Sequence, residues 1–191
     1  DAGWGDCSGG SADGCETDLT TNTNCGSCGN DCTVAFANAA GTCNAGACQM
    51  GACSAGFTDC NASDADGCEI HTDADPANCG GCGVDCSAAP PANTQVDGCT
   101  GGSCDYSCTA GFTDCNGDIL TDGCEVNTDA DINNCGGCGA AFDCVANAPA
   151  NTTATGCSLG SCQYACNAGF ADCDGDLLAN GCEIELDNDT A

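Results

Sequence analysis

Lysine and arginine are absent from the 191 residues, and His71 is the only histidine. With 29 acidic side chains, the formal net charge at neutral pH is -29. Binding to nucleic acid, or to an anionic membrane surface, requires basic side chains that meet the phosphates. We therefore expect no nucleic-acid partner, no attachment to an anionic membrane surface without a bridging metal ion, and no direct membrane insertion.

Catalytic chemistry is equally restricted by this composition. Phosphoryl transfer commonly uses Lys or Arg to neutralise charge, and a nucleophilic triad requires a histidine base. His71 allows one such site at most, and the matching segments of the chain offer no second histidine. We expect no enzyme and assign no catalytic residue.

Large apolar side chains are also scarce. The chain has 24 Val, Ile, Leu, Met, Phe, Tyr and Trp residues, fewer than its 26 cysteines, and no apolar run approaches the ~20 residues of a membrane-spanning helix. Because 24 large apolar side chains are too few to form an ordinary globular core, covalent or metal cross-links must stabilise the fold. An even, high cysteine count is typical of a secreted disulfide scaffold in an oxidising compartment. A thiolate metal store is the alternative, but it lacks the lysines that usually balance thiolates.

The chain contains an internal repeat that begins with GWGDC at residue 3, GFTDC at 56, GFTDC at 111 and GFADC at 169. This predicts three full repeats (1–55, 56–110 and 111–168) and a partial fourth (169–191). No signal peptide is present, so we expect a mature or excised segment of an exported protein. The predicted fold is a set of small disulfide-rich repeats with little regular secondary structure. Short β-hairpins at 94–108 and 153–166 and calcium-type loops stack as an extended rod.

Each full repeat has eight cysteines in the same order, and the fourth repeat has two, Cys173 and Cys182. If all cysteines are paired and each full repeat closes internally, Cys173 must pair with Cys182. By analogy, the other predicted pairs are Cys7 with Cys15, Cys60 with Cys68, and Cys115 with Cys124. The remaining six cysteines of a repeat allow 15 pairings, and the sequence does not choose among them.

Acidic residues cluster after each repeat start: six lie in residues 111–131 and only Asp143 in 132–168. The stretches DCNGDILTDGCE (114–125) and DCDGDLLANGCE (172–183) carry oxygen donors at positions 1, 3, 5, 9 and 12, with a backbone carbonyl at 7. This spacing resembles the EF-hand loop, and oxygen ligands in this number suit Ca²⁺ better than Mg²⁺, Zn²⁺ or copper. The predicted Ca²⁺ ligands are Asp114, Asn116, Asp118, Leu120, Asp122 and Glu125, and Asp172, Asp174, Asp176, Leu178, Asn180 and Glu183.

The loops depart from an EF-hand at position 6, where Ile119 and Leu177 replace glycine, and no helices are expected to flank them. They are closer to the helix-free calcium loops of thrombospondin type 3 and dockerin repeats. In repeat 2 the shorter loop offers Asp59, Asn61, Asp66 and Glu69; in repeat 1 only Asp6, Asp13 and Glu16 remain. We expect site strength to fall from repeat 4 to repeat 1. The alternative is an acidic turn that is closed by a disulfide and binds nothing.

A second acidic stretch follows each loop, as TDADPANC (72–79) and TDADINNC (128–135). Its aspartates could hold a second ion or form a capped turn, and the capped turn is favoured. Asn151, in an Asn-Thr-Thr sequence within an Ala/Pro/Thr loop, is the preferred site for a covalent glycan.

GFADCDGDLLANGCE, the following NCGGCG turn and the C-x4-C hairpin together resemble the cysteine-rich repeats of large secreted proteins of myxobacteria and related environmental bacteria. The resemblance covers essentially the whole chain and implies an extracellular or cell-surface location. The predicted function is a structural component of an extracellular filament or cell-surface rod, stabilised by disulfides and Ca²⁺, that self-associates into a filament or longer array. The alternative is a calcium-dependent adhesin stalk or glycan-binding module.

Overall fold

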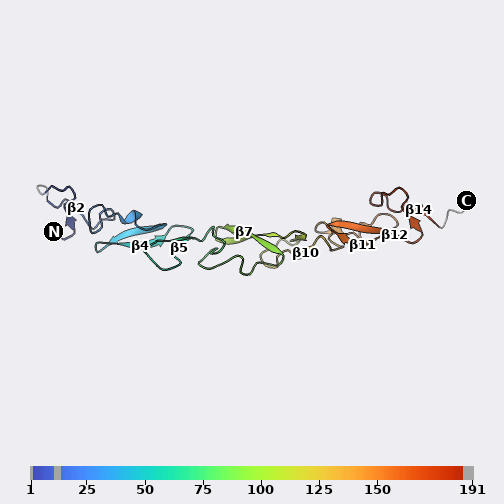
Figure 1. The fold of residues 1–191 in the computed structure, drawn as a ribbon, viewed down its shortest axis with the longest axis horizontal. Helices are drawn as coiled ribbons and strands as arrows, with labels where there is room; N and C mark the ends of the chain where they lie inside the picture. Colours follow the sequence, from blue (N-terminus) through green and yellow to red (C-terminus); the bar gives the residue numbers. More distant parts are fainter. Residues whose placement is uncertain (1, 11–13, 187–191) are drawn as a thin grey trace. The chain divides into compact units, whose positions relative to one another are not determined.

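The computed structural model describes residues 2–10 and 14–186 (Figure 1). Regular structure within these residues consists of short antiparallel strand pairs and two three-residue 3-10 helices. Three long hairpins join β3 (Ala39–Asn44) to β4 (Ala47–Cys53), β7 (Thr94–Thr100) to β8 (Ser103–Cys108), and β11 (Thr152–Ser158) to β12 (Ser161–Cys166). The predicted hairpins at 94–108 and 153–166 are confirmed, and the hairpin at 39–53 is an additional one.

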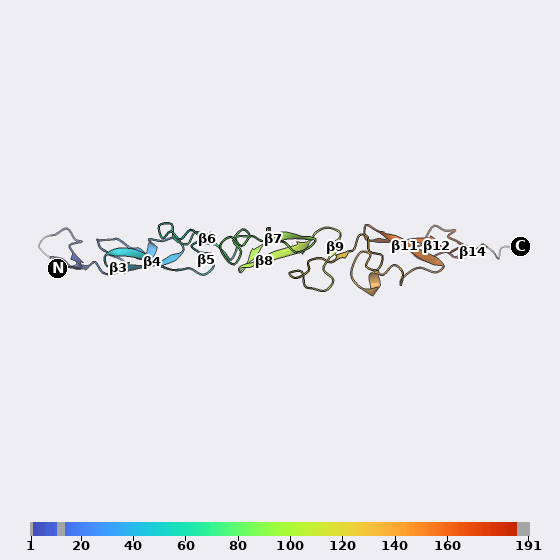
Figure 2. The ribbon, with the colours of Figure 1, turned by 90° about the horizontal axis from the view of Figure 1, so that it is seen from below.

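Each long hairpin turns through two residues with positive φ, as a type I′ turn requires. These turn residues are Ala45 and Gly46, Gly101 and Gly102, and Leu159 and Gly160. The C-x4-C spacing therefore sets two cysteines directly across the hairpin from each other: Cys43 faces Cys48, and Cys157 faces Cys162. Opposite residues of an antiparallel pair project to the same face, so both sulfur atoms leave the hairpin on one side. Figures 1 and 2 show strands β11 and β12 side by side in both views.

Four two-residue strand pairs bring together the two ends of the acidic loops. They are β1 (Trp4–Gly5) with β2 (Thr17–Asp18), β5 (Phe57–Thr58) with β6 (Ile70–His71), β9 (Phe112–Thr113) with β10 (Val126–Asn127), and β13 (Phe170–Ala171) with β14 (Ile184–Glu185). In repeat 2 the Phe57 ring stacks on His71, with 4.5 Å between the ring centroids. Each acidic loop therefore begins and ends at a two-residue antiparallel strand pair.

Two 3-10 helices precede long hairpins: η1 (Cys32–Val34) in repeat 1 and η2 (Ala140–Phe142) in repeat 3. Asp31 caps η1, because its carboxylate accepts hydrogen bonds from the Thr33 backbone N–H and hydroxyl. None of the described helices has the length and hydropathy needed to cross a membrane.

Cystine replaces a hydrophobic core. Every buried apolar residue of the described part of the chain is a cysteine, ten in all. Large apolar side chains stay at the surface instead; Leu159 is 84% exposed and Leu178 is 70% exposed. Burial of aliphatic side chains therefore contributes little to stability, and the disulfides define the fold, as the composition predicts.

The structure has twelve disulfides with one repeating order. Within a repeat, the first cysteine pairs with the fourth, the third with the sixth, and the fifth with the seventh. The eighth cysteine pairs with the second cysteine of the next repeat. In repeat 2 these pairs are Cys60–Cys82, Cys79–Cys99, Cys86–Cys104 and Cys108–Cys124.

The predicted pairs of neighbouring cysteines are wrong. Cys7, Cys60 and Cys115 pair with Cys28, Cys82 and Cys138, whereas Cys68, Cys124 and Cys182 pair with Cys53, Cys108 and Cys166. Cys15 and Cys173 are exposed and unpaired. The prediction assumed that each repeat closes internally, but the second cysteine of a repeat lies against the hairpin before it.

Two compact units divide the chain. The first contains residues 1–89 and 97–105, and the second contains residues 90–96 and 106–191. Every disulfide lies within one unit. The division passes through the β7–β8 hairpin and does not follow the predicted repeat boundaries at 55/56, 110/111 and 168/169, which stay a prediction.

Candidate metal centre

The acidic loop of repeat 4 brings three of its predicted ligands together. Oxygen atoms of Asp172, Asp174 and Glu183 all lie within 4.8 Å of one another. Ligands held at 2.3–2.6 Å from one Ca²⁺ ion lie no more than about 5 Å apart, so this spacing fits a shared ion. Asp176 does not belong to the group. The loop thus offers half of the predicted ligand set in one place.

Hydrogen bonds within the repeat 4 loop hold these carboxylates. Glu183 Oε1 accepts from the Cys173 backbone N–H at 2.9 Å, and Asp172 Oδ1 accepts from Gly175 N–H at 2.7 Å. The Asp176 N–H and the Asn180 amide donate to the two oxygens of Asp174 and lower its pKa. Because Asn180 directs its amide nitrogen toward Asp174, its oxygen points elsewhere, and ligation would require the amide to turn.

The loop of repeat 3 is arranged differently. Asp114 Oδ1 accepts from Gly117 N–H at 2.6 Å, and Glu125 Oε1 accepts from Cys115 N–H at 3.1 Å, as in repeat 4. Asn116 donates its amide to Asp122 at 2.8 Å. Within the described residues of repeats 2 and 3, no three carboxylates come as close together as in repeat 4. Asp118 instead accepts a hydrogen bond from the Thr121 hydroxyl at 2.9 Å, and Leu120 is 65% exposed.

In repeat 2 the loop contains an unsatisfied carboxylate oxygen. Glu69 Oε1 accepts from Cys60 N–H at 3.1 Å, but Glu69 Oε2 is buried and has no hydrogen-bond partner. Asn61 donates to Asp66 at 2.8 Å and lowers its pKa, and Asp59 accepts from Ala62 N–H at 2.7 Å. A buried carboxylate oxygen without a partner is costly, and a cation would satisfy it.

In repeat 1, Glu16 accepts hydrogen bonds from Cys7 N–H at 2.9 Å and Ser8 N–H at 2.8 Å. Asp6 accepts from Gly9 N–H at 2.8 Å, and Asp13 lies outside the described residues. Glu16, Glu69, Glu125 and Glu183 therefore close all four loops by the same contact with the N–H of the first cysteine. This carboxylate contact closes the loop, which was the role expected of the predicted loop disulfide.

The second acidic stretch forms a capped turn. Asp75 accepts from Ala77 N–H at 3.0 Å and from the Asn78 amide at 2.7 Å. Asp131 makes the equivalent bonds with Asn133 N–H and Asn134. These bonds engage both oxygens of each carboxylate and lower both pKa values. The favoured interpretation of this stretch is thereby supported.

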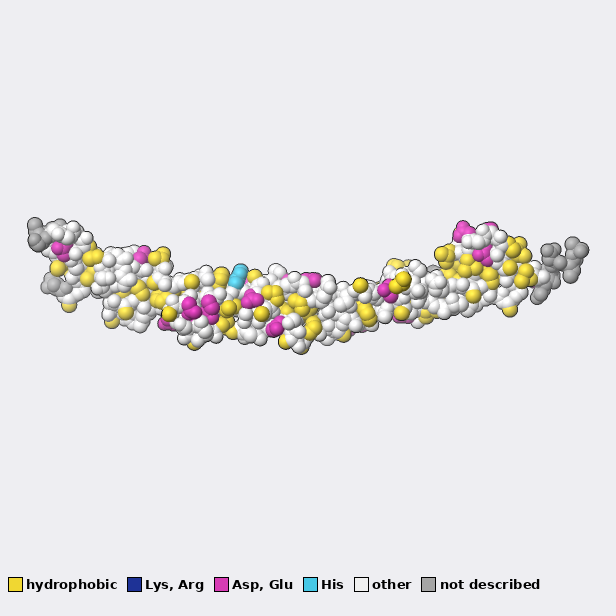
Figure 3. Space-filling model, viewed as in Figure 1, with side chains coloured by type: hydrophobic (Ala, Val, Ile, Leu, Met, Phe, Trp, Pro, Cys, Tyr) yellow, Lys and Arg dark blue, Asp and Glu magenta, His cyan; other side chains and the backbone are white. Residues whose placement is uncertain are grey.

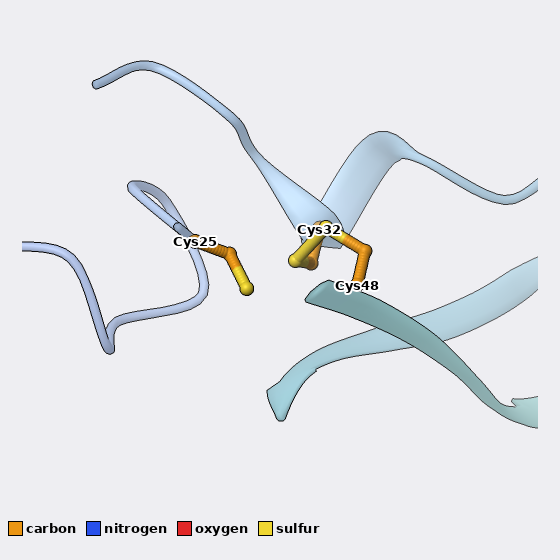
Figure 4. A group of neighbouring side chains, drawn as sticks. All are labelled: Cys25, Cys32 and Cys48. Carbon is orange, nitrogen blue, oxygen red and sulfur yellow. A yellow bond between two sulfur atoms is a disulfide. The ribbon is translucent and has the colours of Figure 1, made fainter. Parts of the chain in front are cut away.

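Three groups of cysteine sulfur atoms also lie close together, but they are cystines. Figure 4 shows Cys25 beside the disulfide between Cys32 and Cys48, and Cys25 itself is bonded to Cys43. Repeats 2 and 3 have the same arrangement around Cys79 and Cys135. A metal ligand must be a free thiolate, so these oxidised groups are packed cores rather than metal sites.

From repeat 2 onward, each acidic loop is joined by hydrogen bonds to an earlier Ala-Asn turn, a contact that the sequence did not predict. In repeat 3, Cys124 N–H donates to the carbonyl oxygen of Ala92 at 2.9 Å, and the Asn93 amide donates to the carbonyl oxygen of Cys124 at 2.8 Å. Asn38 and Asn151 make the same bond to Cys68 and Cys182. The recurring signal is Ala-Asn at 37–38, 92–93 and 150–151. A glycan at Asn151 stays a prediction; in the structure the Asn151 side-chain amide donates its hydrogen bond to the Cys182 carbonyl.

On the face shown in Figure 3, acidic side chains gather in patches between neutral stretches, with no lysine or arginine to balance them. No protein-family profile matches the chain, and no curated protein or solved structure matches it either.

Proposed function

We propose that the chain is a structural component of an extracellular filament or cell-surface rod, with repeats joined in series by disulfides and acidic loops that bind Ca²⁺. The observation that carries this proposal is the inter-repeat bond. Cys53–Cys68, Cys108–Cys124 and Cys166–Cys182 each tie the end of a hairpin to the acidic loop that follows. Twelve cystines suit an oxidising, extracellular setting.

The pairing order suits a chain under tension. A pulling force along the backbone passes from Cys53 to Cys68 and from Cys79 to Cys99 through sulfur. Residues 54–67 and 80–98 then carry no load, because a covalent bond bypasses them. The repeats therefore extend little under tension, as a fibre or stalk requires.

Calcium is proposed in the loops, first of all at Asp172, Asp174 and Glu183. A bound Ca²⁺ ion would supply positive charge to a chain with no lysine or arginine, and hard oxygen ligands suit it. Asp172 and Glu183 hold their ligand oxygens in place by accepting N–H bonds from Gly175 and Cys173. Asp172 and Asp174 lie in the segment that the Cys166–Cys182 bond bypasses, so the ion stiffens the joint against bending rather than against stretching.

Calcium binding is tested by titration calorimetry of the full chain, with Glu183→Gln as the test variant. This change removes a charge while it keeps an oxygen that can accept the Cys173 N–H bond. Asp143→Asn is the matched control, because Asp143 caps a turn outside the loops, where its Oδ1 accepts from Val145 N–H. Loss of the tightest binding phase only in Glu183→Gln supports the site, whereas equal binding by all three chains, or none by the parent, overturns it.

Filament formation is tested by electron micrographs and sedimentation of the full chain with Ca²⁺ and with EDTA. Fibres with a regular axial repeat that soften or shorten in EDTA support the proposal. A chain that stays monomeric and binds sugars on a glycan array would favour a calcium-dependent adhesin stalk or glycan-binding module instead.

A further inference from the structure

Three acidic loops have the same covered face. In repeat 3 this face consists of Gly123, Cys124 and their backbone polar groups. Ala92 and Asn93, from the loop before β7, cover it with the two hydrogen bonds described above. A Cβ atom on Gly123 would lie 2.1 Å from the oxygen of Ala92, so the contact is close. The disulfide to Cys108 completes the cover.

Repeats 2 and 4 repeat this geometry. A Cβ atom on Gly67 would lie 2.3 Å from the oxygen of Ala37, and one on Gly181 would lie 2.1 Å from the oxygen of Ala150. Cys68 and Cys182 donate their N–H groups to the same two carbonyls at 2.8 and 2.9 Å. Both cysteines are fully buried. One glycine, one cysteine and one Ala-Asn turn therefore define a recurring interface.

In repeat 1 the matching face is open. Gly14 has the same backbone form, with φ of +79°, but no atom of the described residues lies within 4 Å of the position of a Cβ atom. Cys15 is exposed and unpaired, in contrast to its three buried counterparts. The loop behind it is closed as in the other repeats, by Glu16. Among the described residues, this face therefore has no counterpart of the Ala-Asn turn that covers the other three.

We propose that Gly14 and Cys15 form a docking surface for the end of a β-hairpin of the same repeat type. Its partner must carry an Ala-Asn turn, whose carbonyl accepts from Cys15 N–H and whose amide donates to the Cys15 carbonyl, and an unpaired cysteine at the hairpin end. A second copy of this chain does not qualify, because Cys53, Cys108 and Cys166 are all paired. The proposal deepens the proposed function and rests on it, because it names the surface through which an array continues.

Docking ends in a disulfide between Cys15 and the hairpin-end cysteine. Each thiol loses one proton and one electron, and an external disulfide, such as oxidised glutathione, takes up both electrons and both protons to become two thiols. Glycine at position 14 leaves room for the partner's carbonyl oxygen, as Gly123 does for that of Ala92.

The test adds a hairpin to the full chain. A copy of residues 111–166 is fused directly before Asp1, with the copied Cys124 changed to Ser so that it leaves no further thiol. The hairpin-end cysteine then precedes Cys15 by the same 15 residues that separate Cys53 from Cys68. After oxidative refolding, the unreduced protein is digested with a protease that cleaves at Asp and Glu, because trypsin has no site. Mass spectrometry identifies the Cys15 partner, and hydrogen exchange reports on its N–H.

The expected result is a disulfide between Cys15 and the copied Cys166, loss of alkylation at Cys15, and strong protection of its N–H. Replacing the copied Asn151 with Ala should reduce that protection severalfold, which separates docking from mere tethering. A Cys15 thiol that stays reactive, pairs with Cys173 of a second molecule, or gains no protection overturns the docking surface. If Cys15 pairs and is protected but micrographs show no fibres, only the proposed function fails.

Discussion

The side-chain amide of Asn151 donates a hydrogen bond to the carbonyl oxygen of Cys182, 31 residues further along the chain, at 2.9 Å. Asn38 and Asn93 make the equivalent bonds at 3.1 and 2.8 Å. All three asparagines have positive φ, between 51° and 55°. Asparagine tolerates this backbone region better than most residues, so one side chain both shapes the turn and joins it to the next loop.

Replacing Asn93 with Ala should loosen the joint at Cys124. The change removes a hydrogen bond worth about 1 kcal/mol and places alanine in the left-handed region at a further cost of about 1 kcal/mol. Hydrogen exchange at Cys124 N–H, which donates to the Ala92 carbonyl, should then be about thirtyfold faster. Asn93→Gly removes the bond without the backbone cost, so it should have the smaller effect. Equal exchange in both variants and the parent would contradict this role.

Gly123→Ala should be far more damaging than Gly117→Ala. The two glycines have nearly the same φ, +84° and +83°, but only Gly123 lies against a neighbouring backbone. Both substitutions place alanine in the left-handed region, and the clash with Ala92 should add about 1–3 kcal/mol at Gly123. Oxidative refolding followed by thiol counting should find Cys108 and Cys124 reduced in a large fraction of Gly123→Ala molecules only. A normal disulfide content in that variant would argue against the close contact.

Titration of Asp131 should show a pKa below the ordinary aspartate value of 3.8. The Asn134 amide is the largest cause of this shift, followed by Asn133 N–H, and both favour the charged carboxylate. The turn's stabilisation is therefore complete above pH 3.8 and is lost as the pH falls through the lowered pKa. Carbon-detected NMR should find that Asn134→Ala raises the Asp131 pKa. Asp75, which keeps its own partner Asn78, should be unchanged and serves as the internal control.

Calcium affinity should be greatest in repeat 4. Among the described residues, three carboxylates converge within 4.8 Å only there, whereas in repeat 3 the Asn116 amide is bonded to Asp122. Terbium luminescence of the full chain should lose its tightest binding phase in Asp174→Asn and only a weaker phase in Asp122→Asn. The reverse order, or loss of both phases in both variants, would contradict the predicted ranking.

Local features of the fold could be predicted from the sequence because they depend on neighbouring residues. The C-x4-C hairpins follow from alternation around a two-residue turn, and the Asp131 turn follows from its own Asn134. The disulfide order could not be obtained in this way. Cys124 pairs with Cys108 rather than Cys115 because the Ala92–Asn93 turn, about thirty residues earlier, places the preceding hairpin against it. Cysteine spacing alone does not reveal such a contact between repeats.

In the acidic loop of repeat 4, spacing predicted that Asp172, Asp174 and Glu183 lie together, and the structure brings their oxygen atoms together. It did not reveal that Glu183 also closes the loop through Cys173 N–H, or that Asn180 directs its amide to Asp174. Those contacts depend on side-chain orientation, which a ligand pattern does not encode.

Disulfide mapping of the native, unreduced chain tests the central claim, that repeats are joined covalently from hairpin end to acidic loop. Digestion at Asp and Glu followed by mass spectrometry should yield peptides that link Cys53 to Cys68 and Cys108 to Cys124. Peptides that link Cys60 to Cys68 and Cys115 to Cys124 instead would show that each loop closes on itself, and would contradict the series of joined repeats.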